Sequence, residues 1–148
     1  MKQALKFAVL FIFLTGMSHA SPENIIGKYM AVTESELVIE LCLFPDKTAH
    51  LLSGYYPVED EDEDTRSTIV GAWTVKDDIL TLDFEQHNTY TYRITNKLSY
   101  AEFGYSGTSF GLKPIKATQS NRITFYELWR PEVLSSIFDS KVSSDCTK

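Results

Sequence analysis

The run ELVIELCLF, residues 36–44, alternates two classes of side chain along the chain. Leucine and isoleucine stand at 37, 39, 41 and 43, whereas both glutamates, Val38 and Cys42 occupy the positions between them. Successive side chains of a strand point to opposite faces of a sheet, so this run predicts a strand with one buried face. The runs ILTLDF (79–84) and TYTYRIT (89–95) alternate in the same way, which indicates an all-β chain.

The spacing of such runs predicts eight strands joined mostly by short turns. Short links favour antiparallel neighbours, so we expect a single up-and-down barrel; a two-sheet β-sandwich is the alternative that spacing leaves open. Residues 106–120 contain two glycines and a proline, and we expect a long loop or a broken strand pair there. The expected strands are 25–33, 36–44, 47–55, 67–76, 79–85, 89–96, 98–105 and 121–129.

A short helix is expected after the last strand, over about 131–140. It begins at Pro131, a residue favoured in the first turn, and Val133, Leu134, Ile137 and Phe138 recur at helical spacing. The chain has two cysteines, Cys42 and Cys146. In an oxidising compartment this even number predicts one disulfide. Because Cys42 is on the outward face of its strand, together with Val38 and Phe44, the bond would bring the tail and helix against the barrel exterior.

The first twenty residues resemble a secretory signal peptide. Lys2 and Lys6 precede an apolar run, and Ser18-His19-Ala20 fits a cleavage site, so we expect cleavage after Ala20. The apolar run is too short for a membrane span, which needs about 20 apolar residues, and no later segment approaches that length. We therefore expect a periplasmic protein whose single domain covers residues 21–148.

Net charge narrows the choice of partner. Without residues 1–20 the chain keeps 12 of its 14 basic residues and all 20 acidic ones, a balance of −8. Binding to nucleic acid needs a basic face, so a nucleic-acid partner is not expected, and an anionic membrane surface is disfavoured for the same reason. A basic protein partner is compatible with this charge.

Six consecutive carboxylates fill residues 59–64, between two expected strands. Asp60, Asp62 and Asp64 match positions one, three and five of an EF-hand calcium loop. The match then fails, because the loop needs glycine at its sixth position and glutamate at its twelfth, where this chain has Thr65 and Gly71. We therefore expect no specific metal site.

Two interpretations of this acidic run remain. It is either a solvated hairpin loop or an acidic surface that meets a basic partner, with the two preceding tyrosines as contact area. Those tyrosines are also compatible with rim or core positions of a barrel. The candidate partner-binding residues are Tyr55, Tyr56, Glu59, Asp60, Glu61, Asp62, Glu63 and Asp64.

Signals for catalysis are weak. After cleavage the histidines are His50 and His87, on different expected elements, and no nucleophile, metalloprotease or phosphate-loop motif accompanies them. Glu102 and Glu127 lie on apolar segments, and two inward carboxylates are one arrangement for acid–base chemistry. We nevertheless expect a protein that is not an enzyme and has no cofactor.

The eight Tyr, six Phe and two Trp of residues 21–148 are enough to fill a barrel core or to line a ligand cavity.

Two short motifs resemble the small lipocalin-like, calycin-type barrels of bacterial envelopes. One is IIGKYM, and the other is IVGAWTVKDDILTL; each has a glycine followed two places later by an aromatic residue. Tyr29 stands where lipocalins have tryptophan. The matching residues are Gly27, Tyr29, Gly71, Trp73, Leu80 and Leu82. The resemblance covers roughly residues 25–94 and implies a barrel whose relatives act as carriers, envelope-stress sensors or inhibitors of cell-wall enzymes.

Three hypotheses follow for function. The leading one is a non-enzymatic protein-binding module, an inhibitor or immunity protein against a basic cell-wall-degrading enzyme or toxin. The second is a lipocalin-like carrier of a small apolar ligand. The third is a structural component of the cell envelope.

Overall fold

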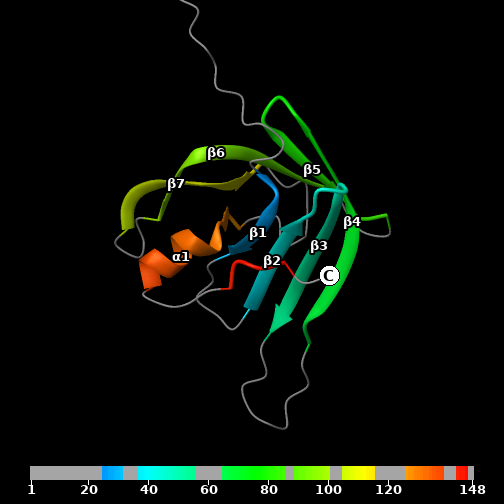
Figure 1. The fold of residues 1–148 in the computed structure, drawn as a ribbon, viewed down its shortest axis with the longest axis horizontal. Helices are drawn as coiled ribbons and strands as arrows, with labels where there is room; N and C mark the ends of the chain where they lie inside the picture. Colours follow the sequence, from blue (N-terminus) through cyan, green and yellow to red (C-terminus); the bar gives the residue numbers. More distant parts are fainter. Residues whose placement is uncertain are drawn as a thin grey trace, which may run out of the picture.

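Eight antiparallel strands form a closed barrel in simple up-and-down order (Figure 1). The computed structural model describes residues 25–31, 37–55, 65–85, 89–100, 105–115, 126–138 and 143–146, and only the backbone at 97–100, 105–109 and 137–138. The barrel and its order confirm the expected fold class, and they exclude the sandwich. The strands are β1 (Gly27–Ala31), β2 (Leu37–Leu43), β3 (Thr48–Tyr55), β4 (Ser67–Lys76), β5 (Ile79–Asp83), β6 (Tyr90–Tyr100), β7 (Tyr105–Pro114) and β8 (Leu128–Trp129).

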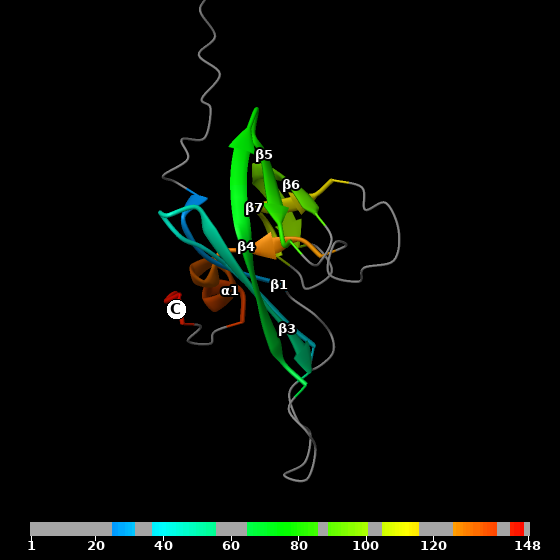
Figure 2. The same cartoon turned by 90° about the vertical axis from the view of Figure 1, so that its right-hand side faces the viewer.

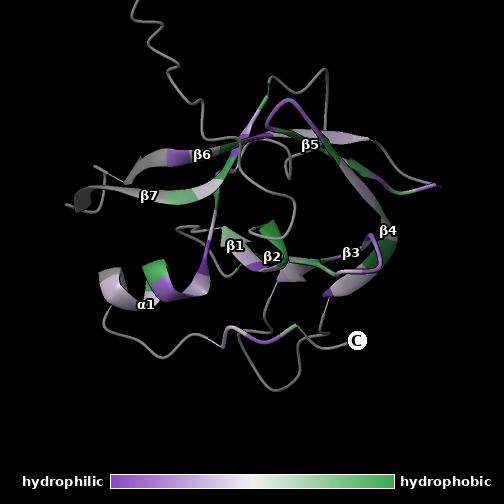
Figure 3. Cartoon of the chain, turned by 45° about the horizontal axis from the view of Figure 1, so that its top comes forward, coloured by the Kyte–Doolittle hydropathy of each residue, from purple (hydrophilic) through white to green (hydrophobic). Residues whose placement is uncertain are grey.

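Side-chain alternation fills the barrel interior as the sequence predicts. In the β2–β3 pair, Leu41 lies opposite Leu51 and Leu43 opposite Ala49, and all four are buried. Figure 3 shows hydrophobic and hydrophilic positions alternating along the barrel wall. Every strand contributes to one buried cluster, which comprises Ile25, Tyr29, Ile39, Leu41, Leu43, Ala49, Leu51, Trp73, Leu80, Leu82, Phe84, Tyr90, Tyr92, Ile94, Leu112 and Leu128.

The two ends of the barrel carry different connections. One end, here called the rim, is formed by the carboxyl ends of β1, β3, β5 and β7. The other, here called the turn end, carries the tight β2–β3 and β4–β5 turns. Asp77 and Asp78 have φ of 51° and 60°, the left-handed pair that fits the twist of a two-residue hairpin turn. Figures 1 and 2 show β3 and β4 running side by side along the barrel wall between the two ends.

The expected strand at 89–96 lies within β6, but the separate strand expected at 98–105 and the long loop or broken strand pair expected at 106–120 were wrong. β6 continues without a turn to Tyr100, and β7 occupies Tyr105–Pro114 within the supposed loop. The pairing of β6 with β7 has register shifts between Thr95 and Leu98 and between Leu98 and Tyr100, which are the irregularities typical of β-bulges. The last strand is also shorter than expected: β8 begins at Leu128, and residues 121–125 lie outside the described residues.

The C-terminal helix α1 (Pro131–Phe138) follows β8 directly and contacts β1. Trp129 points away from the interior that Leu128 faces, yet it is 1% exposed, and Leu134 of α1 is also buried. Cys42 and Cys146 form the expected disulfide, with their Cα atoms 5.7 Å apart. The helix and the C-terminal segment therefore lie outside the barrel, as expected, and residues 139–140 of the expected helix lie outside the described residues.

The expected signal peptide, residues 1–20, also lies outside the described part of the chain. Within the described ranges, no helix has the length and apolar character needed to cross a bilayer.

Candidate functional site

The β3–β4 hairpin carries the acidic run, and the structure describes the base of that hairpin. Leu52 pairs with Thr68 and Ser53 with Ser67, so the two strands stay together up to the rim. The backbone N–H of Tyr55 donates a hydrogen bond to Oγ1 of Thr65 at 3.0 Å. The residues on either side of the connection are thus held together at one point of the rim. Tyr56 and residues 59–64 lie outside the described residues.

A glycine makes this close approach feasible. Gly54 has a φ of +144°, and a Cβ atom there would collide with the Cα of Arg66 and the carbonyl oxygen of Thr65. Only glycine adopts this backbone conformation readily and leaves room for the neighbouring strand. Gly54 therefore allows β3 to approach Thr65 and Arg66 closely at the base of the hairpin, immediately before Tyr55.

Tyr55 itself is a rim residue. It lies on the interior-facing side of β3, two places beyond Ser53, and its register partner is the half-buried Leu37. It is nevertheless 42% exposed, one of two large exposed hydrophobic residues within the described ranges. The other, Val70 at 59%, lies on the outward face of β4, so the two do not form a single patch. Of the alternatives left open for this tyrosine, the structure places it at the exposed rim.

Of the four residues considered for catalysis, the structure describes Glu127 and His50. Glu127, one of the two carboxylates considered for acid–base chemistry, forms an ion pair with Lys113 at 3.5 Å. His50 is half-buried, with its ring edge-on to that of Phe44 at 4.7 Å between centroids. Glu102 and His87 lie outside the described residues. In the part of the chain that the structure describes, no group of three or more His, Cys, Asp and Glu residues is arranged to hold a metal ion.

Burial governs the acidity of two interior tyrosines. It raises the pKa of Tyr29 well above its usual value, and the Arg130 guanidinium offsets part of that rise. Burial raises the pKa of Tyr92 in the same direction, with a further contribution from Tyr90. Both hydroxyls therefore stay protonated at neutral pH, and neither is suited to act as a base.

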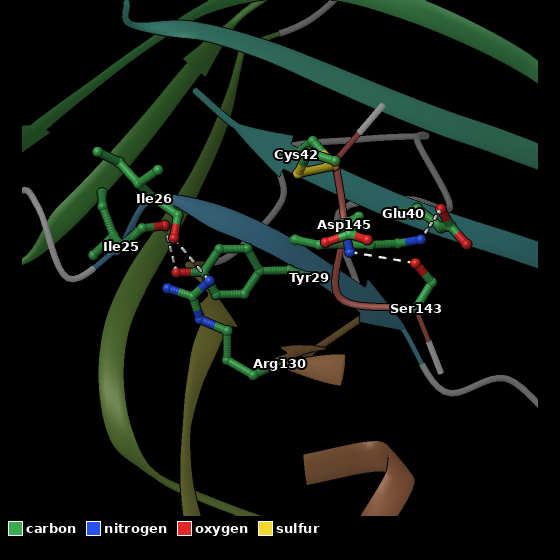
Figure 4. Close-up of a disulfide and its surroundings, with 10 residues drawn as sticks. Ile25, Ile26, Tyr29, Glu40, Cys42, Arg130, Ser143 and Asp145 are labelled. Atoms are coloured by element: carbon green, nitrogen blue, oxygen red, sulfur yellow. Dashed lines mark hydrogen bonds and ion pairs between the residues drawn. A yellow bond between two sulfur atoms is a disulfide. The ribbon is translucent and has the colours of Figure 1, made fainter. Parts of the chain in front are cut away.

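Arg130 is the main residue that sequence reasoning missed. Its Nη1 donates a hydrogen bond to the carbonyl oxygen of Ile26 at 2.9 Å, and its guanidinium lies 4.3 Å from the ring centre of Tyr29 (Figure 4). The Tyr29 hydroxyl donates to the carbonyl oxygen of Ile25 at 2.8 Å. This group of four residues, here called the first clasp, joins the end of β8 to the start of β1 and completes the barrel.

The contact of Arg130 with β1 explains why the first motif has a glycine at position 27. A Cβ atom at Gly27, whose φ is +123°, would lie 2.5 Å from Nη1 of Arg130. The glycine therefore clears the space that the guanidinium needs. The signal in the sequence was Gly27 itself, but its partner lies 103 residues further along the chain.

The second glycine motif makes a similar arrangement, here called the second clasp. Trp73 is 1% exposed, and its Nε1 donates a hydrogen bond to the carbonyl oxygen of Phe44 at 3.0 Å. Nζ of Lys47 lies 3.7 Å from the centre of the Trp73 ring. A Cβ atom at Gly71 would collide with the carbonyl oxygen of Asp83 and the ring of Phe84. The motif thus secures the β2–β3 turn and the β4–β5 contact.

Comparisons of the chain with family models, with curated proteins and with solved structures found no match. The closed eight-stranded barrel with its short helix is consistent with the lipocalin-like fold that the two motifs implied.

Proposed function

We propose that this protein is a secreted, non-enzymatic protein-binding module, an inhibitor or immunity protein that meets a basic cell-wall-degrading enzyme or toxin. Its contact surface would be the β3–β4 connection: Tyr55, Tyr56 and the six carboxylates of residues 59–64. The observation that supports this proposal is the hairpin base, where Gly54 and the hydrogen bond between Tyr55 and Thr65 hold the two described ends of the β3–β4 connection together at the rim, beside an exposed tyrosine.

Electrostatics gives this arrangement a physical role. Dense negative charge attracts a positively charged protein over a distance of about 8–10 Å at ordinary ionic strength and raises the association rate. Tyrosine supplies rigid contact area at little cost in conformational entropy, which suits a residue at the edge of such a surface. A basic enzyme is therefore a better fit than an acidic one or a nucleic acid.

The barrel interior supports a binding surface outside the barrel more than a carrier. Interior side chains from all eight strands form one buried cluster that includes Tyr29, Trp73, Tyr90 and Tyr92. An eight-stranded barrel is just wide enough for side chains to fill it. The carrier hypothesis would require a cavity between these aromatic rings.

The disulfide supports an extracytoplasmic location, because disulfides persist in oxidising compartments. The periplasm, reached through a signal peptide cleaved after Ala20, is our more specific proposal.

The test is affinity capture from periplasmic extract with the mature protein as bait, at low and at high salt. Replacing Asp60, Asp62 and Asp64 by asparagine should weaken capture of a basic protein at least tenfold. A matched control replaces the exposed Asp77, Glu132 and Asp145 by their amides, which removes the same charge elsewhere. Equal capture by both variants, or capture that is unchanged by salt, would contradict the proposal.

A further inference from the structure

We propose that one edge of β4, residues 67–71 on the side away from β3, binds an extended segment of the basic partner as an added strand. We call these residues the open edge. The bound segment would have uncharged, strand-forming residues in its middle and Lys or Arg at both ends. This inference rests on the proposed function for the positive charge of the partner, and it adds where the partner binds and in which conformation.

The open edge exists because β5 is shorter than β4. β4 pairs with β3 over residues 67–72 but with β5 only over residues 72–76. β5 ends at Asp83, and Phe84 then packs edge-on against Tyr90 of β6, with 5.8 Å between the ring centroids. The chain therefore leaves β5 on the side of β6, away from β4. Figure 2 shows the first part of β4 continuing past the end of β5, beside β3.

The register of β4 shows which backbone groups face the open edge. The N–H of Trp73 donates a hydrogen bond to the carbonyl oxygen of Lys47 at 2.9 Å, so the backbone groups of Trp73 face the β3 side. Successive residues of an antiparallel strand direct their N–H and C=O groups alternately to its two sides. The β3–β4 pairing has no register shift, so Ile69 also faces β3, whereas Thr68 and Val70 face the open edge. Thr68 and Val70 therefore each present one N–H and one C=O to an added strand.

The side chains of the open edge favour such pairing. Threonine, isoleucine and valine prefer strands, and residues 67–71 include no charged residue and no proline. Thr68 is exposed, and Val70 is 59% exposed. Edge strands that face only water are usually protected by lysine, proline or a bulge. The open edge has none of these protections, which is the arrangement of an edge that accepts another strand.

Negative charge at both ends of the open edge indicates the chemistry of the occupant. At one end, Asp83 and Glu85 are exposed where β5 stops. At the other end, the six carboxylates of residues 59–64 come just before Thr65 and Arg66 in the chain, and they outnumber the charge of Arg66. A segment with Lys or Arg on both sides of an uncharged middle would meet opposite charge at each end.

A second copy of the chain fits this edge less well. Two open edges would pair antiparallel around Ile69, with Thr68 of each copy opposite Val70 of the other. That register would bring the acidic run of each copy toward Asp83 of the other, and like charges in such positions repel. We therefore commit to a basic partner, and self-association becomes an outcome of the tests.

The first test uses the unmutated mature protein and the synthetic peptide KKTVTVTKK, with amide hydrogen exchange measured by NMR. In the free protein, the amides of Thr68 and Val70 should exchange faster than that of Ile69, which is bonded to β3. With about nine-tenths of the protein bound, exchange at Thr68 and Val70 should slow about tenfold, because only the free protein exposes these amides. The amide of Ile69 should change much less.

Two control peptides separate the contributions of backbone and charge. KKTVPVTKK, which has a proline in its middle, and EETVTVTEE, which reverses the charge, should both give little protection. Absence of protection by KKTVTVTKK at Thr68 and Val70 would overturn the open edge as a binding site. Equal protection by EETVTVTEE would overturn the choice of a basic segment.

The second test is the Val70→Pro variant. Proline has no N–H, and because the N–H of Val70 faces away from β3, an edge position of this kind tolerates proline. Val70→Pro should bind KKTVTVTKK about tenfold more weakly, since it loses one hydrogen bond and places a ring at the edge. Val70→Thr, which keeps the N–H, is the matched control and should bind as the unmutated protein does. Equal binding by Val70→Pro, shown to be folded by circular dichroism, would overturn the proposal, and the exchange measurement decides if this variant does not fold.

Affinity capture distinguishes a failure of this inference from a failure of the proposed function. Capture that is lost in the asparagine variant of the acidic run but kept in Val70→Pro would overturn the open edge and leave the proposed function in place. Capture that is lost in Val70→Pro but kept in the asparagine variant would overturn the acidic contact surface instead. In sedimentation velocity, the free protein should be a monomer; a dimer that Val70→Pro abolishes would overturn the basic partner in favour of a second copy.

Discussion

Removal of the Arg130 guanidinium should open the junction between the first and last strands. Arg130→Met keeps much of the aliphatic stem but deletes the hydrogen bond to Ile26 and the contact with the Tyr29 ring. A hydrogen bond from a charged donor contributes about 1.5–3 kcal/mol, and a partly desolvated cation–π contact about 0.5–2 kcal/mol. We therefore expect the free energy of unfolding to fall by about 2–4 kcal/mol, measured by urea denaturation.

A double-mutant cycle with Gly27 tests the geometry behind this number. Gly27→Ala should be costly for two reasons: its Cβ would lie 2.5 Å from Arg130 Nη1, and alanine is strained at a φ of +123°. The backbone strain alone costs about 1–3 kcal/mol and persists in any background. The steric part should vanish once Arg130 is methionine, so Gly27→Ala should cost less in that background. Equal costs in the two backgrounds, or a loss below about 1 kcal/mol for Arg130→Met alone, would refute the reasoning.

Two further predictions concern the other buried aromatic side chains. Trp73→Phe should lower the free energy of unfolding by about 1–3 kcal/mol in urea titrations, because it leaves the Phe44 carbonyl without the indole donor; an unchanged midpoint would count against the second clasp. Stability should also fall as pH rises above about 10, where tyrosines of the unfolded chain ionise while buried Tyr29 and Tyr92, whose pKa values are raised, keep their protons. The folded state binds more protons there, so each tyrosine should contribute a slope of up to about 1.4 kcal/mol per pH unit. Tyr92→Phe should flatten the decline between pH 10 and 11, and an identical slope would contradict the assignment.

The strand pattern was predictable where one face is strongly apolar. The runs that became β2, β5 and the first part of β6 alternate cleanly, and the expected start of each lies within one residue of the observed one. β7 was not predictable in this way, because YSGTSFGLKP contains two glycines and two serines and has little intrinsic strand preference. It is a strand because β6 supplies a partner along its length and because Leu112 is fully buried.

The candidate site was predictable only in part, for a related reason. The two glycine–aromatic motifs are visible in the sequence because the glycine and the aromatic residue of each lie only two positions apart. Arg130 donates a hydrogen bond to Ile26 and contacts the ring of Tyr29 across the junction of β8 and β1. No residue near position 130 in the sequence indicates either of these contacts. The neighbours of Cys42 are likewise a matter of register, since Lys28 and His50 meet it only once three strands are aligned. A single-residue shift in one of these pairs would move the basic side chain of that pair to the other face.

The two clasps also bear on the role of the disulfide. In each clasp, a buried aromatic side chain donates a hydrogen bond to a backbone carbonyl, and a cation lies over its ring. These contacts stabilise the barrel at the junction of β8 and β1 and at the β2–β3 turn. A disulfide that closes a loop of about 100 residues still adds up to about 4–5 kcal/mol by restricting the unfolded chain. That contribution acts on the unfolded state, whereas the clasps act on the folded one. Breaking the bond should therefore reduce the free energy of unfolding without changing the barrel, because the contacts of both clasps remain.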